Sequence, residues 1–435
     1  MKKQDLSRRN FVKSTAAVTA ASIAGSAFTI VKAESVRGTR ANSMVQIGWV
    51  GQGGQGSRDA YLLEKTGKAK IVALADYFQY RIDNALAPLK PGQQKADLAN
   101  LDRKKTFRGI DAYKAIMNLG DIDAVLLTTP PGFRPEHFRS AIMAKKHVFA
   151  EKPLAVDGPG IRLVAEAGEK ALAQKLSVVV GLQRHYSKAY RACKKLIDEG
   201  ALGTIGLTHS AWDQGDLWQD RRAKYDKSKW PTQMDWEVEH WYYFKWLCGD
   251  HIVEQNIHNI DVINWMLGAH PLRASGFGGR TARTEIGDIN DHFAINYEYP
   301  KGIVSSNTCI QIDGTMGDVS ETIRGSKGTF TTTAGKGGTG GTRIEGARPR
   351  RGGDAPMIYK YEDTDDLHYD QEAATFVASV LGTGEGEDKY RNDTKYGVES
   401  TLTAIMGRDA AYKGRVITWE EAWNSKEKLA FKGGA

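Results

Sequence analysis

Between residues 44 and 181, short apolar runs alternate with amphipathic stretches. The apolar runs predict strands at Val45–Val50, Lys70–Ala75, Ala124–Thr128, His147–Ala150 and Ser177–Gly181. The stretches between them predict helices at Ser57–Thr66, Ile110–Asn118, Pro135–Lys145 and Gly160–Lys175. Strands that are apolar at almost every position are buried on both faces, which requires a parallel sheet with helices on each side. This part of the chain is therefore predicted to be a doubly wound α/β domain.

From about residue 200 the pattern changes to longer segments in which polar and apolar positions alternate. Strands of this kind are expected at Ile205–Trp212, Leu272–Thr281, His292–Tyr299 and Ile303–Ile312. Period-two alternation with Gly and Pro turns predicts an open, predominantly antiparallel sheet covered on one face, an α+β arrangement. Helices are expected at Asp250–Leu267 and Lys395–Tyr412. The Gly- and Arg-rich segment 333–354 is expected to be a mobile loop or insertion.

The first 33 residues have the pattern of an export signal. The twin-arginine motif SRRNFVK at 7–13 lies in a basic segment, an alanine-rich apolar run follows, and Val31-Lys32-Ala33 fits a cleavage site. An amphipathic N-terminal helix is the alternative. The motif predicts that the twin-arginine translocase exports the protein to the periplasm. The expected organisation is a signal peptide at 1–33, a linker at 34–43 and domains at 44–178 and 179–425.

The net charge of +8 does not indicate a nucleic-acid partner. Residues 1–33 carry six basic residues and one acidic residue, so the rest of the chain has a formal charge of only +3. One short basic run, Arg348, Arg350 and Arg351, lies in the glycine-rich segment and is typical of a solvated loop. No later stretch approaches the roughly 18 apolar residues of a membrane span. We expect neither a nucleic-acid partner nor a stable membrane span.

A glycine-rich loop directly follows the first predicted strand. Residues 51–56 read GQGGQG, the G-x-G-x-x-G pattern in the strand–loop–helix context that a dinucleotide pyrophosphate requires. The first glycine turns the chain, the second lets the backbone approach the pyrophosphate, and the third lets the helix pack on the strand. A glycine turn in a nucleotide-free domain is the alternative. The residues expected to contact a cofactor here are Gly51, Gly53, Gly54, Gln55 and Gly56.

Asp76 ends the second predicted strand, twenty residues after Gly56. A carboxylate at this place accepts hydrogen bonds from the adenosine ribose hydroxyls and repels a 2′-phosphate. The sequence therefore predicts a Rossmann dinucleotide-binding domain that takes NAD, with NADP less favoured. A protein exported in the folded state can carry NAD with it only if the cofactor is tightly bound, and we expect that here.

Lys152 follows the strand predicted at His147–Ala150, at the edge of the sheet where ligands bind. Its amino group can exchange a proton with a substrate hydroxyl at that place. A salt bridge that Glu151 makes within the loop is the structural alternative. From the chemistry of these residues alone, both interpretations stay open.

Glu254, His258 and Asp261 are spaced i, i+4 and i+7 on the helix predicted at Asp250–Leu267. This spacing predicts one ionisable stripe on an otherwise apolar helix, which suits a cleft. A glutamate one turn from a histidine can orient it, although ordinary surface pairing would give the same spacing. Glu254 and His258 lack a convincing third ligand, so no metal site is predicted.

Six of the ten tryptophans lie in residues 212–246. The aromatic residues of this segment are Trp212, Trp218, Trp230, Trp236, Trp241, Tyr242, Tyr243, Phe244 and Trp246. The charged residues near them are Asp213, Asp216, Arg221 and Arg222. Aromatic faces stack on sugar rings, so one or two of these rings are expected to contact a carbohydrate, and the others to form core or a subunit contact.

Together, these motifs resemble those of the Gfo/Idh/MocA family (glucose–fructose oxidoreductase, inositol dehydrogenase and rhizopine catabolism proteins). The resemblance rests on the glycine loop, Thr129-Pro130 with His137, Glu151-Lys152-Pro153, and Glu254-x-x-x-His258 with Asp261. It extends from about residue 44 to 425 and includes AIMG at 404–407 and the ending Val416–Ser425. The resemblance implies a Rossmann domain joined to an open sheet domain, and oxidation or reduction of sugars and cyclitols.

The resemblance also implies roles for individual residues. Lys152 and His258 match the catalytic lysine and histidine of the family, and Glu254 stands where many members have aspartate. The cofactor contacts it adds are Thr129, Pro130, His137, Glu151, Lys152, Gln183 and Arg184. The expected substrate contacts are Lys152, Arg184, Tyr186, Trp212, Asp213, Glu254 and His258. The run Gln183-Arg184-His185-Tyr186 differs from the family's usual Asn-Arg-Arg-aromatic run.

The sequence thus predicts an exported NAD-dependent oxidoreductase that acts on a sugar or cyclitol with Lys152 and His258 as acid–base groups. Two alternatives remain open. One is a glycoside-cleaving enzyme in which NAD oxidises the ring transiently, and the other is a non-catalytic sensor of sugars or nucleotides. The second domain is also expected to form a homo-oligomer, a dimer or a tetramer, through its sheet.

Overall fold

The structure is a computed structural model that describes residues 44–217, 226–333, 341–349, 352–362 and 367–433. The signal peptide at 1–33 and the linker at 34–43 lie outside these residues, and so do Trp218, Arg221, Arg222, Arg350 and Arg351. Within the described residues, no helix is both long and apolar enough to cross a membrane.

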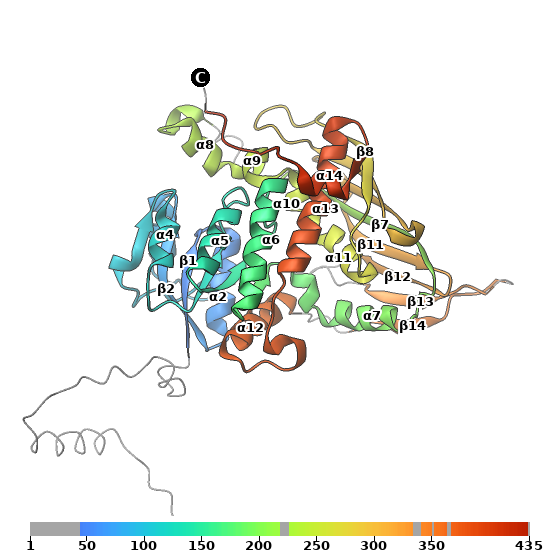
Figure 1. Cartoon of the computed structure of the whole chain (residues 1–435), viewed down its shortest axis with the longest axis horizontal. Helices are drawn as coiled ribbons and strands as arrows, with labels where there is room; N and C mark the ends of the chain where they lie inside the picture. Colours follow the sequence, from blue (N-terminus) through green and yellow to red (C-terminus); the bar gives the residue numbers. More distant parts are fainter. Residues whose placement is uncertain (1–43, 218–225, 334–340, 350–351, 363–366, 434–435) are drawn as a thin grey trace, which may run out of the picture. The chain divides into compact units, whose positions relative to one another are not determined.

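The first sheet is parallel throughout and has the strand order β3-β2-β1-β4-β5-β6. Its strands β1 and β2 are labelled in Figure 1. Its strands are β1 (Val45–Val50), β2 (Ala69–Asp76), β3 (Thr106–Arg108), β4 (Ala124–Leu127), β5 (His147–Ala150) and β6 (Val178–Val180). This order is that of a Rossmann fold and confirms the predicted fold class. The sequence did not predict β3, because its three residues form no apolar run and none is buried.

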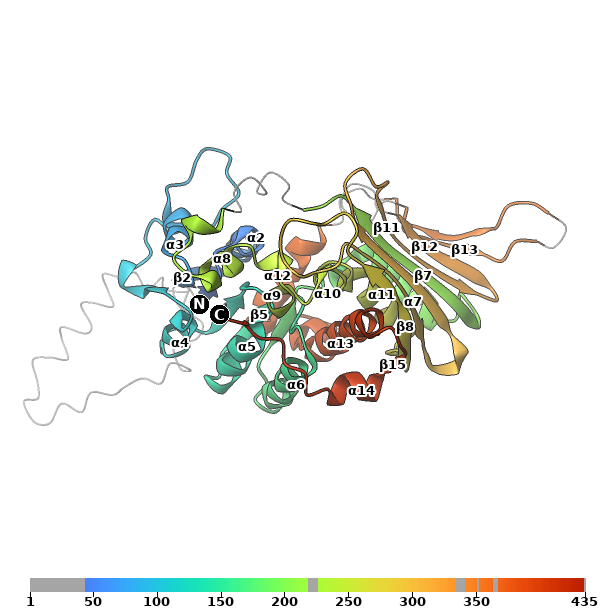
Figure 2. The ribbon, with the colours of Figure 1, turned by 90° about the horizontal axis from the view of Figure 1, so that it is seen from above.

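Helices cover this sheet on both faces. The helices that follow its strands are α2 (Gly54–Lys65), α3 (Gln79–Leu86), α4 (Ala112–Met117), α5 (Arg134–Met143) and α6 (Gly158–Ala173). A later helix, α12 (His368–Leu381), packs beside α2 and buries Phe376 edge-to-face on Phe149 of β5, with ring centres 5.6 Å apart (Figure 2). In β6, the Val178 N–H donates a hydrogen bond to the backbone oxygen of Arg391, and the Val178 oxygen accepts one from the Asp393 N–H. The C-terminal part of the chain therefore completes the first sheet.

The second sheet has nine strands in the described residues, in the order β14-β13-β12-β11-β7-β10-β9-β8-β15. The strands are β7 (Ile205–Gln214), β8 (Arg273–Gly279), β9 (His292–Glu298), β10 (Val304–Gln311), β11 (Asp318–Gly325), β12 (Gly328–Thr333), β13 (Arg343–Gly346), β14 (Met357–Lys360) and β15 (Ile417–Thr418). Strands β7 and β10 pair in parallel and the other neighbours pair antiparallel. The expectation of a predominantly antiparallel sheet is confirmed.

Helices cover one face of the second sheet. The remaining helices are α7 (Lys188–Asp198), α8 (Gln233–Glu239), α9 (Lys245–Cys248), α10 (His251–Glu254), α11 (Ile257–Leu267), α13 (Thr394–Lys413) and α14 (Trp419–Asn424). Helices α11 and α13 pack on the inner face, where β9 buries Phe293, Ile295 and Tyr297 at alternate positions. The opposite face is open and carries apolar side chains, including Phe277, which is 81% exposed.

The segment 333–354, expected to be a mobile loop, is partly strand. Residues Arg343–Gly346 form β13, which pairs with β12 and β14. Ile344 is buried and the neighbouring positions alternate, a pattern that the Gly- and Arg-rich composition had hidden. Residues 334–340 and 350–351 of this segment lie outside the described residues.

The helix expected at Asp250–Leu267 is two helices, α10 and α11. The break falls at Gln255 and Asn256, and the Asn256 side chain donates to the backbone oxygen of Thr308 in β10 at 2.8 Å. Glu254 and His258 therefore stand on different helices, and the continuous i, i+4, i+7 stripe predicted from the sequence is wrong.

Candidate active site

A cavity of about 560 Å³ is lined by the carboxyl ends of the first sheet's strands together with residues of β7, α10 and α11. The residues expected at the cofactor that line it are Gly51, Gly53, Gly54, Gln55, Gly56, Asp76, Thr129, Pro130, His137, Glu151, Lys152 and Gln183. The residues expected at the substrate that line it are Lys152, Trp212, Glu254 and His258. Arg184, Tyr186 and Asp213 are not among the lining residues.

The glycine loop has the shape that a pyrophosphate needs. Gly51 has φ +100°, and a Cβ there would lie 2.7 Å from the backbone of Thr128 and Thr129. A Cβ at Gly56 would collide with Thr128 Oγ1 and Gly51 O, whereas Cβ atoms at Gly53 and Gly54 would meet nothing within 4 Å. Helix α2 begins at Gly54 without a side-chain cap. Its first N–H groups therefore face open space, where an anion can bind them.

Asp76 closes the far end of this loop. Its Oδ2 accepts from Gln52 N at 2.7 Å and its Oδ1 accepts from Phe78 N at 2.9 Å. Burial raises the pKa of the carboxyl group, and the two backbone N–H groups oppose that shift. Each oxygen keeps a second lone pair, so Asp76 can still accept from a ribose hydroxyl.

The loop after β4 is fixed by two buried side chains. Thr129 Oγ1 lies 3.0 Å from His137 Nδ1, and the histidine ring packs on Tyr113 with centres 4.1 Å apart. Burial lowers the pKa of His137 to about 3, with Arg134 adding to the effect, so the ring is neutral. Arg134 is 2% exposed and donates to the backbone oxygens of Pro153 and Thr129. It thereby joins the loops that carry Thr129 and Lys152.

Lys152 and Glu254 form an ion pair across the cavity. Lys152 Nζ lies 2.9 Å from Glu254 Oε1 and donates to the Glu254 backbone oxygen at 2.6 Å. Burial raises the pKa of Glu254, and the lysine opposes that shift. The sequence predicted that Glu254 orients His258, but its carboxylate instead holds the lysine. Its Oε2 is buried and has no hydrogen-bond partner among the described residues.

His258 stacks on Trp212, with ring centres 5.6 Å apart and an angle of 27°. Burial lowers the pKa of His258 well below its usual value, and the positive charges of Lys152 and Arg184 add to the effect. The ring is therefore neutral near pH 7. The guanidinium group of Arg184 lies 5.8 Å from the Trp212 ring and is paired with the buried Glu321. Arg184 supports the wall behind the cavity.

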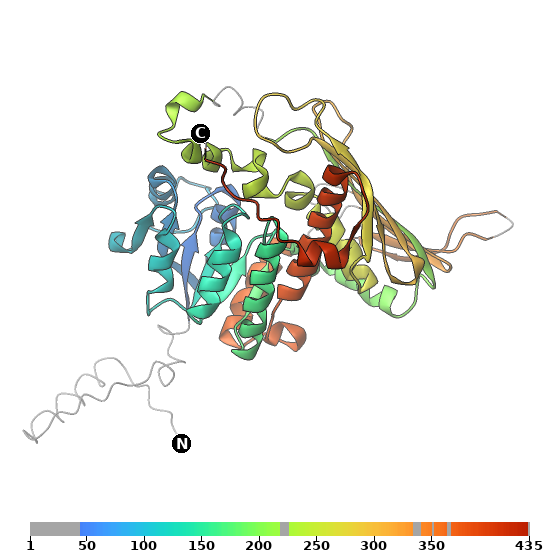
Figure 3. The same cartoon turned by 45° about the horizontal axis from the view of Figure 1, so that its top comes forward.

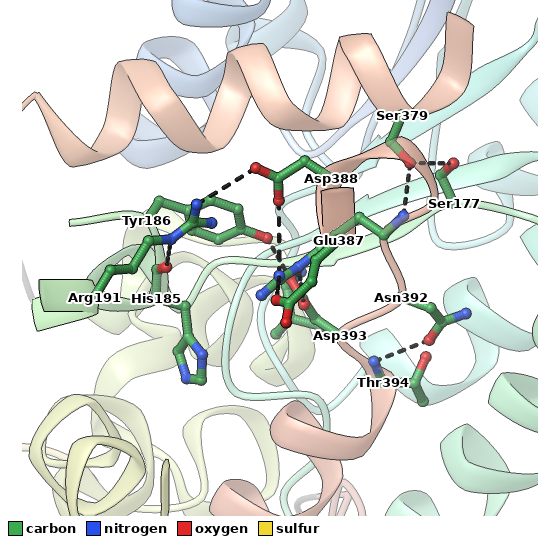
Figure 4. Close-up of polar contacts among 12 residues, drawn as sticks. Ser177, His185, Tyr186, Arg191, Ser379, Glu387, Asp388, Asn392, Asp393 and Thr394 are labelled. Atoms are coloured by element: carbon green, nitrogen blue, oxygen red, sulfur yellow. Dashed lines mark hydrogen bonds and ion pairs between the residues drawn. The ribbon is translucent and has the colours of Figure 1, made fainter. Parts of the chain in front are cut away.

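His185 and Tyr186 of the same run are not among the residues that line the cavity. The hydroxyl of Tyr186 donates to Asp393 (Figure 4), and the side chain is fully buried, so its expected substrate contact is corrected to a core role. His185 Nε2 lies 2.8 Å from Asp261 Oδ2. Asp261, the third member of the predicted ionisable stripe, thus pairs with His185 and not with a group in the cavity.

Asp213 also points away from the cavity. Neighbouring residues of a strand face opposite sides, and Trp212 takes the cavity side. Asp213 is aligned with Asp318 of β11, and burial and that second carboxylate raise its pKa. The expected substrate contact of Asp213 is therefore not present. Asp216 is buried in an ion pair with Arg283 at 3.0 Å.

The aromatic segment divides between cavity and core. Trp212 and Trp241 line the cavity, while Tyr242, Tyr243 and Phe244 are buried in a hydrophobic cluster. Trp230 packs on Phe78, the residue two positions after Asp76, with ring centres 5.5 Å apart. Figure 3 shows this yellow-green segment beside the blue strands and helices of the first sheet. Trp230, Asp235 and Glu239 of this segment therefore lie at the predicted adenosine end.

Sequence reasoning missed two arginines of the cavity wall, Arg134 and Arg81. Arg134 stands in the helix start after Thr129-Pro130, where a buried arginine cannot be told from a surface one. Arg81 follows Asp76 by five residues, and this closeness was the one available signal. In the described residues, no group of three or more His, Cys, Asp or Glu side chains is arranged to hold a metal ion.

Two family models match the chain. Residues 45–182 match "Oxidoreductase family, NAD-binding Rossmann fold", and residues 194–418 match "Oxidoreductase family, C-terminal alpha/beta domain". These models define a class of two-domain oxidoreductases with an NAD-binding Rossmann domain. The chain belongs to this class as a member of the Gfo/Idh/MocA family.

Curated relatives include inositol 2-dehydrogenases. That of Klebsiella pneumoniae (strain 342) is 34% identical over 200 residues, 46% of this chain and 47% of the relative. That of Ralstonia nicotianae is 29% identical over 263 residues, 60% of this chain and 65% of the relative. The chain spans about half the length of the first of these relatives and 65% of the second.

Solved structures share the fold. Scyllo-inositol dehydrogenase from Lactobacillus casei, with bound cofactor NAD(H) and scyllo-inositol, has a TM-score of 0.63 at 20% identity, over 87% of this chain and 99% of that chain. Aldose-aldose oxidoreductase from Caulobacter crescentus, complexed with glycerol, has a TM-score of 0.63 at 15% identity, over 86% of this chain and 99% of that chain.

Proposed function

We propose that this protein is an NAD(H)-dependent oxidoreductase that interconverts a hydroxyl group and a ketone on a sugar or cyclitol. The observation that carries the proposal is the meeting of Lys152, Glu254 and the neutral His258 in the cavity that the glycine loop lines. The relatives named inositol 2-dehydrogenase support the substrate class. Trp212 and Trp241 add aromatic surface of the kind that sugar rings stack on.

The residues present fit a dinucleotide. The open Cβ directions at Gly53 and Gly54 leave room for the pyrophosphate at the start of α2, and Asp76 keeps lone pairs for the ribose. When bound, NAD(H) supplies the hydride acceptor or donor at the ring carbon. The buried polar wall formed by Thr129, His137 and Arg134 would hold the nicotinamide end.

Lys152 and His258 divide the work on the substrate hydroxyl. Oxidation breaks the carbinol C–H and O–H bonds, and the neutral His258 takes the hydroxyl proton as the carbonyl forms. The ammonium group of Lys152, held at 2.9 Å from Glu254 Oε1, donates a hydrogen bond to the oxygen as it gains negative charge. In the reverse direction His258 returns the proton. The fixed ion pair keeps the lysine aimed at one place in the cavity.

We further propose that the protein is exported by the twin-arginine route with its cofactor bound, on the basis of the motif at residues 7–13. A homo-oligomer formed through the open face of the second sheet completes the proposal. Leu207 and Val304 are aligned on the neighbouring strands β7 and β10, Phe277 lies on the same face of β8, and all three are exposed. Exposed apolar patches of this kind mark contact surfaces.

The test is a substrate panel. The purified protein is incubated with cyclitols, aldoses and glycosides, with and without added NAD⁺, and the products are analysed by mass spectrometry. The proposal expects a product two hydrogen atoms lighter than one of the free polyols, formed together with NADH. Release of free sugar from a glycoside with no net NADH would contradict this proposal and favour redox-assisted glycoside cleavage. Binding of a ligand without any product would favour a non-catalytic sensor.

A further inference from the structure

The adenosine end of the cavity carries a second charged pair. Arg81, from α3, lines the cavity near Asp76, and its NH2 lies 2.8 Å from Glu239 Oε2 of α8. Tyr80 donates its hydroxyl hydrogen to the same glutamate oxygen. The ion pair is partly shielded, with side chains 22% and 20% exposed. Glu239 thus reaches from the second half of the chain to the predicted cofactor site.

We propose that Glu239 is a specificity-determining residue that keeps this protein selective for NAD by withholding Arg81 from a 2′-phosphate. The inference rests on the proposed cofactor and deepens it. An arginine near the end of the second strand is the group that accommodates the 2′-phosphate in NADP-binding Rossmann domains. Here Arg81 is such an arginine, but it is already in an ion pair with Glu239.

The charges at this end explain the effect. Asp76 and Glu239 are negative and Arg81 is positive, so the three together leave a net negative charge beside the ribose. The Asp76 pKa senses both neighbours, since Arg81 lowers it and Glu239 raises it. A 2′-phosphate would meet net repulsion from these three groups and an Arg81 that is already paired, whereas the uncharged hydroxyls of NAD would not be repelled.

The position of Glu239 is fixed by contacts that do not involve its own carboxylate. Tyr77 donates its hydroxyl hydrogen to Asp235 at 2.8 Å, and Thr232 caps the start of α8 by accepting from Asp235 N at 3.1 Å. Trp230 packs on Phe78 just before this helix. Removing the charge of Glu239 alone should therefore leave α8 in place and release the arginine.

The test measures retained cofactor, not activity. Mature protein and its Glu239→Gln variant are equilibrated with equal concentrations of NAD⁺ and NADP⁺, separated from free dinucleotide by gel filtration, and analysed by mass spectrometry. We expect the retained NADP⁺ to NAD⁺ ratio to rise by about tenfold in the variant, since one charge-assisted contact to phosphate is gained. Glutamine keeps an oxygen for Tyr80, which favours a folded variant.

Three further variants identify the cause. Adding Arg81→Gln to Glu239→Gln should remove the gain, while adding Arg108→Gln, at an exposed arginine aligned with Asp76 on β3, should preserve it. Asp83→Asn, which neutralises an exposed acid on α3, should not change the ratio. An unchanged ratio in Glu239→Gln, or a gain that survives Arg81→Gln, would overturn the inference. Retention of neither dinucleotide by the unaltered protein would instead overturn the proposed cofactor, and with it the inference.

Discussion

Lys152 Nζ and Glu254 Oε1 lie 2.9 Å apart, although the two residues are 102 positions apart in the chain. Lys152 follows strand β5 of the first sheet, and Glu254 is the last residue of helix α10. The pair is nearly enclosed, with side chains 10% and 8% exposed. Charges held this way in a shielded site keep their geometry and interact strongly with a nearby ligand. The predictions below follow from this pair and from the groups around it.

Replacement of Lys152 by methionine should abolish turnover while the cofactor still binds. Methionine is unbranched and only one heavy atom shorter than lysine but lacks the donor, so activity should fall by a factor on the order of 100 or more. The measurement is the steady-state rate with the best substrate of the panel, together with the amount of retained NAD(H). Near-normal turnover would show that Lys152 has only a structural role, the pairing with Glu254.

Replacement of Asp76 by alanine should weaken NAD binding by a factor on the order of ten, because the ribose hydroxyls lose a charged acceptor. The preference over NADP should narrow at the same time, because a negative neighbour of the 2′-phosphate is removed. Titration of both dinucleotides against the variant measures both effects. Asp83→Asn serves as the control for loss of an acidic residue elsewhere on the same side of the domain. Unchanged selectivity in Asp76→Ala would show that the ribose lies elsewhere.

His137 should make the protein lose stability in acid. Its folded-state pKa is lowered to about 3 by burial, against about 6.5 in the unfolded chain. Between these values the unfolded state binds the extra proton, so stability is full above about pH 6.5 and falls as the pH drops toward 3. One such group contributes a slope of up to about 1.4 kcal/mol per pH unit.

The His137→Gln variant tests this slope. Glutamine can keep a hydrogen bond to Thr129 but does not titrate, so the variant should lose less stability than the original protein between pH 6.5 and pH 4, whatever its stability at neutral pH. Denaturant unfolding at a series of pH values gives both curves. Parallel curves would mean that the histidine is not held neutral in the folded state.

Protein isolated from the periplasm should carry close to one NAD(H) per chain through gel filtration. The periplasm offers no dependable supply of the dinucleotide, so a cofactor that left freely would be lost after export. Replacing Arg8 and Arg9 by lysine should keep the precursor in the cytoplasm, folded and loaded, because both positions precede the NAD-binding family match at 45–182. Protein that arrives empty but works with added NAD⁺, or a double variant that is exported efficiently, would contradict this.

Five of the six strands of the first sheet could be predicted to within one residue at each end, and the reason is physical. Strands such as β4 and β5 are buried on both faces, so every position is apolar and the run itself marks the strand. Strand β3 and the strands from β11 to β13 were missed because half-exposed or edge strands rich in polar residues and Gly carry little apolar signal. The edge strands β14 and β15 were missed because four and two residues are too few to show an alternation.

The site was predictable where a motif fixes the backbone and not where a distant contact decides. Gly51 and Gly56 need close backbone approach, so their places followed from the pattern. At the break between α10 and α11, the Asn256 side chain donates a hydrogen bond to Thr308 in β10, about fifty residues later in the chain. No local spacing of residues reveals such a contact. The core position of Tyr186 could not be predicted either, because its hydrogen-bond partner Asp393 lies in the C-terminal part of the chain.

Helix α12 gives the protein a particular order of assembly. Until the ribosome has made His368–Leu381, Phe149 on the first sheet lacks the Phe376 ring that covers it, and β6 lacks the backbone partners at residues 391 and 393. A nascent or truncated chain ending before this helix would expose that apolar surface to chaperones and proteases. The nucleotide-binding half therefore gains its last covering helix and the partners of its edge strand only after residue 393 has been synthesised.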